Sequence, residues 1–160
     1  MTPFAWLIGL LLPACAASGA NGLPAPALMD MTHLQRPASP NTALAAPAGT
    51  QPAADIATPP FAVSAEKLYQ AVRAMAAAQP RTFLAAEFAA NHQVHFVARS
   101  AVLNFPDLIT AQVNAAGPDS STLVLYSRSV YGYGDFGVNR KRLIAWLAAL
   151  QTTINHPVER

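Results

Sequence analysis

The chain has 160 residues, of which 52% are apolar and 11% are charged, and its formal net charge is +2. This length and apolar content predict one domain with a real hydrophobic core. Apart from Arg140-Lys141-Arg142, the basic residues are scattered along the chain. The broad basic face that neutralises many phosphates is missing, so we expect no nucleic-acid partner.

The N-terminus has the pattern of an export signal. Residues 4–12 are apolar, which suits the hydrophobic region of a secretory signal and is too short to span a bilayer. The run Leu12-Pro13-Ala14-Cys15 resembles a bacterial lipobox, in which the cysteine becomes the lipidated first residue. The alternative is ordinary cleavage by Ala20, which removes the only cysteine. We therefore predict a signal peptide within residues 1–20, cleaved before Cys15 or by Ala20. The protein is expected to be exported to the periplasm, where cleavage before Cys15 would leave a lipid on that residue as its membrane contact.

Residues 21–60 form a proline-rich segment with eight prolines and no sustained periodicity. Each proline removes a backbone donor and biases the preceding residue toward an extended conformation. We expect neither a long helix nor a central strand here. The segment is interpreted as a tether or, alternatively, as an extended arm in which residues 34–41 and Ile56 pack on the domain.

Residues 61–160 have the periodicity of a folded domain. Ser64 predicts the start of a first helix, and Gln79-Pro80 predicts its end. After this helix, the periodicity predicts four strands, at residues 81–88, 93–100, 108–113 and 122–129. It predicts a last helix at residues 138–154. The expected fold is α+β, with about four mostly antiparallel strands and two helices packed on the sheet, preceded by the proline-rich extended arm.

A glycine-rich loop lies between the last predicted strand and the last helix. Gly132, Gly134 and Gly137 fit G-x-G-x-x-G, but a dinucleotide site also needs a second parallel strand after the helix. The predicted helix is the last element, so we expect no dinucleotide and no other cofactor. We interpret the glycines as permitting positive φ angles in a tight turn, with Asp135 capping the helix.

Three cations, Arg140-Lys141-Arg142, occupy the first turn of that helix, where the helix macrodipole disfavours positive charge. In one interpretation they pair with a carboxylate of Glu87, Asp107, Asp119 or Asp135, or they simply point into water. In the other, loop amides and arginines form a pocket for a phosphate or carboxylate. The candidate anion-binding residues are Arg128, Gly132, Tyr133, Gly134, Asp135, Asn139, Arg140 and Arg142.

The segment Gly132–Arg142 resembles the closing motif of the bacterial and plastid family named domain of unknown function 1499. The run Pro37-Ala-Ser-Pro-Asn41 is similar to that family's opening Ser-Pro-Asn segment, and the resemblance spans residues 36–150. Members often have arginines where this chain has Tyr126 and Val130, and Arg128 substitutes for them in part. The resemblance implies a fold but no reaction.

Catalytic and metal sites are not indicated. His92 and His95 lie three apart on an extended segment, so their side chains are expected on opposite faces, and we predict no metal site. No nucleophile–base pair is recognisable, so no catalytic residue is assigned. We expect a tethered binding or accessory domain of the cell envelope, whose partner is an envelope protein or an anionic ligand. The alternative is a small hydrolase or transferase acting on a phosphate- or carboxylate-bearing substrate at the loop of residues 132–142.

Overall fold

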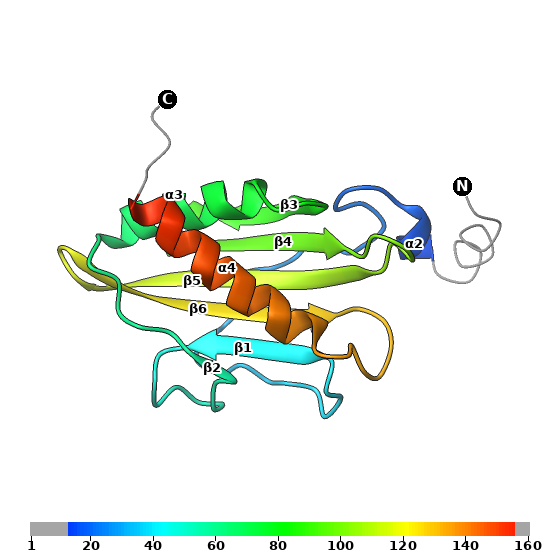
Figure 1. Cartoon of the computed structure of the whole chain (residues 1–160), viewed down its shortest axis with the longest axis horizontal. Coiled ribbons are helices and arrows are strands. Elements are labelled where there is room, and N and C mark those ends of the chain that lie inside the picture. The colour runs from blue at the N-terminus through cyan, green and yellow to red at the C-terminus, as the bar shows by residue number, and fades with distance from the viewer. Residues whose placement is uncertain (1–12, 156–160) are drawn as a thin grey trace.

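A computed structural model describes residues 13–155 of the chain (Figure 1). The predicted apolar signal region at residues 4–12 lies outside the described residues. The strands are β1 (Thr42–Ala46), β2 (Ile56–Ala57), β3 (Thr82–Phe88), β4 (Gln93–Arg99), β5 (Pro106–Gly117) and β6 (Ser120–Ser129). The helices are α2 (Pro13–Ala16), α3 (Ala65–Ala77) and α4 (Val138–Asn155), with a short 3-10 turn at Ala89–Asn91.

The prediction of about four mostly antiparallel strands with two helices was wrong. The sheet has six strands in the order β2-β1-β6-β5-β4-β3, and it is mixed because β1 pairs antiparallel with β6 and parallel with β2. A third helix, α2, was also not expected. Both additional strands come from the proline-rich segment. Residues 42–46 contain no proline, so β1 keeps the backbone donors that an inner strand needs, and Pro40 and Pro47 stand just outside it.

The elements after residue 60 agree with their predicted positions. Ser64 caps α3, because its hydroxyl accepts a hydrogen bond from the backbone N–H of Lys67 at 3.3 Å. The four predicted strands correspond to β3 to β6, although β5 continues four residues further than expected, to Gly117. No helix among the described residues is long and apolar enough to cross a membrane.

One face of the sheet is covered by α3 and α4, which lie side by side across it (Figure 1). Inward residues of both helices pack on alternate residues of the strands, and the Phe96 and Trp146 rings meet edge to face at 5.7 Å. Under α4, β1 presents only Ala43 and Ala45, whose small side chains admit the helix. Burial of this continuous apolar layer is the main source of stability.

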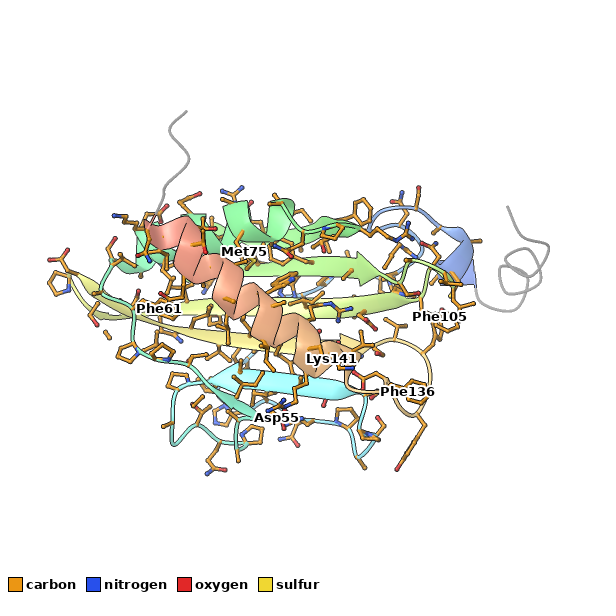
Figure 2. The ribbon with its side chains drawn as sticks, in the orientation of Figure 1. Asp55, Phe61, Met75, Phe105, Phe136 and Lys141 are labelled. Atoms are coloured by element: carbon orange, nitrogen blue, oxygen red, sulfur yellow. The ribbon has the colours of Figure 1, made fainter. Side chains whose placement is uncertain are left out.

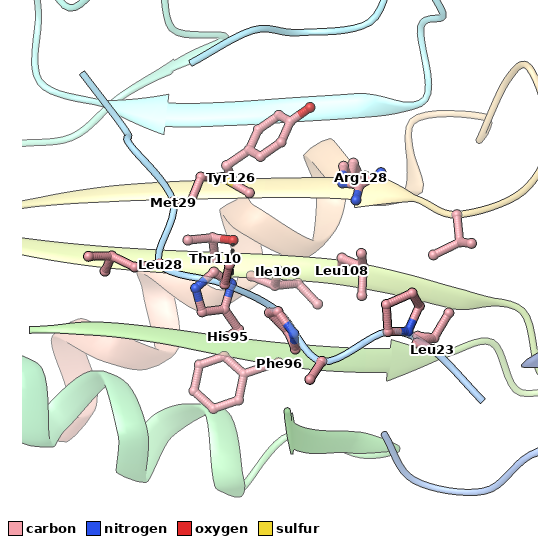
Figure 3. A pocket seen from close by; sticks show the side chains of 15 residues that line it. Leu23, Leu28, Met29, His95, Phe96, Leu108, Ile109, Thr110, Tyr126 and Arg128 are labelled. Atoms are coloured by element: carbon pink, nitrogen blue, oxygen red, sulfur yellow. Dashed lines mark hydrogen bonds between the residues drawn. The ribbon is translucent and has the colours of Figure 1, made fainter. Parts of the chain in front are cut away.

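The other face of the sheet is crossed by the N-terminal arm, which we define as residues 14–34. Met31 and Leu34 of the arm pack in a second apolar cluster with Leu44 of β1 and Tyr126 of β6. Figure 3 shows the arm running obliquely over the strands on the side away from α4. The sheet is therefore covered on both faces, by helices on one and by extended chain on the other.

Candidate functional site

The loop between β6 and α4 is fixed by Asp135, whose predicted role as a helix cap is confirmed. Its carboxylate accepts hydrogen bonds from the backbone N–H groups of Gly137 at 2.9 Å and Asn139 at 2.8 Å. Gly132 and Gly137 have φ angles of +87° and +74°, which the tight turn requires. The carboxylate also neutralises part of the positive potential at the start of α4.

Asn139 is fully buried and joins the two ends of the family motif. Its side-chain amide donates to the backbone oxygen of Asn41 at 2.9 Å, and its oxygen accepts from the Ser127 hydroxyl at 2.5 Å. Asn41 in turn donates to the carbonyl of Gly132 at 2.7 Å. The opening and closing motifs, about a hundred residues apart in the chain, therefore form one buried hydrogen-bond network.

Arg142 belongs to the same network. Its guanidinium donates to the Asp107 carboxylate at 2.6 Å and to the Asn139 side-chain oxygen at 2.7 Å. The Arg142 and Asp107 side chains are only 14% and 9% exposed. Loss of either partner would leave a buried charge, so the pair is a structural element. This geometry corresponds to the carboxylate-pairing interpretation of the basic turn.

The other candidate anion-binding residues are not gathered at one place. Arg140 is exposed on α4, and Tyr133 is 77% exposed at the loop tip, with Gly132 and Gly134 beside it. Arg128 projects from the opposite face of the sheet, toward the arm, because it alternates with Ser127 and Ser129 along β6. The loop therefore does not bring Arg128 and the α4 cations to a common ligand.

Arg128 instead lines a groove between the arm and the sheet, which we call the arm groove (Figure 3). Its volume is about 410 Å³. The arm contributes residues 23–29 to its wall. The strands contribute mainly His95 and Phe96 of β4, Leu108, Ile109 and Thr110 of β5, and Tyr126, Arg128 and Val130 at β6.

The arm groove is mostly apolar, with its charge at one end. Arg128 is half-buried and takes part in none of the ion pairs among residues 13–155. Nearer the other end, burial lowers the pKa of His95, which keeps the imidazole neutral at neutral pH. His95 bonds to Gln93 at 2.8 Å and to Thr110 at 3.0 Å, so its polar atoms are satisfied.

The arm is pinned to the sheet at each end of the groove. At one end, Gln93 exchanges two hydrogen bonds with the backbone of Met29, at 2.8 and 2.7 Å. At the other end, the buried guanidinium of Arg99 donates to the carbonyl oxygens of Gly19 at 2.6 Å and Asn21 at 2.8 Å. The described hydrogen bonds include none from residues 22–28 to the sheet. The roof of the groove is therefore held by hydrogen bonds at its two ends.

Cys15, the predicted lipidation site, is buried in α2 at the Arg99 end of the arm. Burial raises the pKa of its thiol, and the nearby Arg99 charge opposes this in part. Arg99 also donates to the carbonyl oxygen of Ala14 at 2.6 Å.

The two histidines considered as a metal pair lie apart. His92 faces α3, where it contacts Glu66 at 3.2 Å and the ring of Tyr69, whereas His95 lies on the arm side. Among residues 13–155, no three histidine, cysteine or carboxylate side chains are close enough to hold a metal ion.

The comparisons with known proteins identify the family. A family model described as Protein of unknown function (DUF1499) matches residues 34–150. The chain belongs to this family. Among curated proteins, none matches the sequence. The crystal structure of Ara h 8.0201 is similar to this structure with a TM-score of 0.44 and 8% sequence identity, over 61% of this chain and 93% of that chain.

Sequence reasoning missed the arm groove and the polar residues that hold the arm. Gln93, His95 and Arg99 were assigned to a strand without a role. Their alternation with Val94, Phe96 and Ala98 was visible, and it placed Arg99 on the same face as Gln93 and His95. The partner of Arg99, the carbonyl groups of residues 14–21, had no signal in the pattern.

Proposed function

We propose that this member of the family is an exported, membrane-attached binding domain that holds an amphiphilic anionic ligand in the arm groove. The arm groove carries this proposal. Its volume is in the range of small-molecule sites, and its wall is mainly apolar with few polar groups. A hydrocarbon chain would bury its surface along Leu108 and Ile109, while a carboxylate or phosphate would pair with Arg128.

A carboxylate or phosphate head would supply a partner for Arg128, which takes part in no ion pair within residues 13–155. A half-buried guanidinium presents several donors, and an anionic ligand would satisfy them. The pinned arm also suits a binding role, because the segment between the Gln93 and Arg99 pins can move to admit a ligand. Export and attachment through Cys15 are supported by the N-terminal sequence pattern alone.

The hydrolase or transferase alternative receives less support. It required Asp135 and Arg140 to act together on one substrate. Asp135 is engaged by backbone N–H groups of its own loop, and Arg140 is exposed on α4. Neither observation favours catalysis at the loop.

The test uses a fluorescent polyene fatty acid and its methyl ester as probes, with protein purified from its own envelope and stripped of lipid. We expect the acid to bind and Arg128→Gln to weaken it by about tenfold, the effect of losing one charge-assisted hydrogen bond. The ester should bind the variant and the parent chain equally. Arg140→Gln removes the same charge away from the groove and is the matched control. Failure of the acid to bind, or equal effects of the two variants, would refute the proposal.

A further inference from the structure

One end of the sheet exposes apolar side chains on two neighbouring loops. Val102 and Leu103, in the β4–β5 turn, are 86% and 38% exposed, and Phe136, in the β6–α4 loop, is 97% exposed. The Phe105 and Tyr131 rings, 6.3 Å apart, connect the two loops. Figure 2 shows Phe105 and Phe136 at the same end of the long axis. We call this surface the loop end.

Exposure of this kind needs an explanation. Single exposed apolar residues are ordinary on protein surfaces. Val102 and Phe136 are both almost fully exposed and lie on adjacent loops, so they form an apolar patch of the kind that marks an interaction site. Phe136 also has a φ angle of +53°, a conformation that is rare for a bulky residue, so the turn holds its ring outward at a cost in strain.

The charge at the loop end is basic. Arg81, Arg140 and Lys141 are exposed there. The carboxylates of this end, Asp107 and Asp135, point inward to Arg142 and to the backbone of α4. The acidic residues in the β5–β6 turn and the first turn of α3, Asp119 and Glu66, lie at the opposite end of the strands.

The predicted anchor position, Cys15, lies against the first of these loops, the β4–β5 turn. The side-chain amide of Asn104, in the β4–β5 turn, donates to the carbonyl oxygens of Cys15 at 2.6 Å and Ala17 at 2.9 Å. α2 and both loops occupy one end of the molecule (Figure 1). A lipid on Cys15 would therefore leave the chain beside the β4–β5 turn, with no long tether between the domain and the bilayer.

We infer that the loop end docks on an anionic lipid surface. Val102, Leu103 and Phe136 enter the interfacial layer of the bilayer, as apolar and aromatic side chains at membrane surfaces do. Arg81, Arg140 and Lys141 contact the lipid phosphates. This inference rests on the exported state in the proposed function and not on the arm groove. It extends the expectation that the protein contacts the membrane through an N-terminal lipid alone.

The experiment places one fluorescent label on the full chain, after export and processing by its host. Val102→Cys and Phe136→Cys report the loop end, and Asp119→Cys reports the opposite end as the matched control. Each labelled protein is reconstituted in vesicles of phosphatidylethanolamine and phosphatidylglycerol that contain an acyl-chain quencher. If the host cleaves by Ala20 instead, the soluble processed form is mixed with the same vesicles and read in the same way.

We expect most of the emission to be lost at positions 102 and 136 and little at 119. Quenching at 102 and 136 no greater than at 119 would overturn the inference, whether or not the arm groove binds the fatty-acid probe. For the soluble processed form, Arg140→Gln with Lys141→Gln should weaken partition into these vesicles by about fivefold per cation. Equal partition of the parent chain and this double variant would also contradict it.

Discussion

The two faces of the sheet are closed by different means. The helix-covered face is sealed by large buried side chains of α3 and α4, such as Leu68 and Trp146, which form one apolar core with the strands. The arm-covered face is closed by an extended chain with few large side chains, held by polar pins at Gln93 and Arg99. The arm groove, with a volume of about 410 Å³, lies beneath this second cover.

This difference assigns stability mainly to the helix-covered face and the proposed binding to the arm-covered face. Interdigitated helices leave no room for a ligand without loss of core contacts. Between the Arg99 and Gln93 pins, residues 22–28 of the arm make none of the described hydrogen bonds to the sheet, so a shift of this stretch breaks few of the interactions that hold the fold. The family motif, including Asn139 and Arg142, belongs to the helix side and stabilises the fold. The candidate ligand contacts, including Arg128, belong to the arm side.

The largest expected effect is a loss of stability, and it should differ between arginines on the two faces of the sheet. Arg142→Gln leaves Asp107 buried without its partner and should lower the free energy of unfolding by about 3–5 kcal/mol. Arg128→Gln, on the arm side, should change it by no more than about 0.5 kcal/mol. Urea unfolding can be followed by the fluorescence of Trp146, the only tryptophan after the predicted signal peptide. Similar losses in both variants would remove the distinction between the faces.

A smaller effect is expected from the arm pin. Arg99→Met keeps the apolar stem but removes the donors to Gly19 and Asn21, which should cost about 1–3 kcal/mol. Cleavage within residues 16–28 by a protease of broad specificity should become about tenfold faster, because the arm detaches locally. Arg140→Met is the matched control, since Arg140 is exposed at the start of α4, on the face of the sheet away from the arm. An unchanged cleavage rate in Arg99→Met would show that the pin does not hold the arm.

The smallest effect is the pH dependence that His95 adds on the arm side. Because burial lowers its pKa in the folded chain, the unfolded chain binds the proton more readily. His95 therefore opposes folding only as the pH falls below about 6.5, the unfolded value, and has no such effect above it. We expect the free energy of unfolding to decrease on acidification through this range. His95→Gln should show a shallower decrease, and an equal slope in both proteins would exclude His95 as its source.

Much of the domain after residue 60 followed from local patterns. The cap at Ser64 and the cap at Asp135 depend on groups a few residues apart, so the sequence alone predicts them. The strand β1 did not follow, because composition over residues 21–60 suggested extended chain without a partner. A five-residue run between Pro40 and Pro47 becomes an inner strand only because β6 and β2 supply hydrogen bonds on both sides.

The candidate site was predictable only in part. The sequence identified the carboxylates available to the basic turn, and Asp107 is the one that pairs with Arg142. It could not place Arg128 relative to Arg140, because that depends on which face of the sheet receives the helices. The arm groove also forms only on the face of the sheet that the helices do not cover.

The sequence by itself determined the family, the elements after residue 60 and the turn that Asp135 closes, because each depends on neighbouring residues. The tertiary structure decided that Asn41 meets Asn139, that Arg99 holds the arm and that Arg128 faces a groove. These contacts join segments about 80 to 100 residues apart. Such pairings are fixed by sheet order and by the burial of both faces, which no local periodicity encodes.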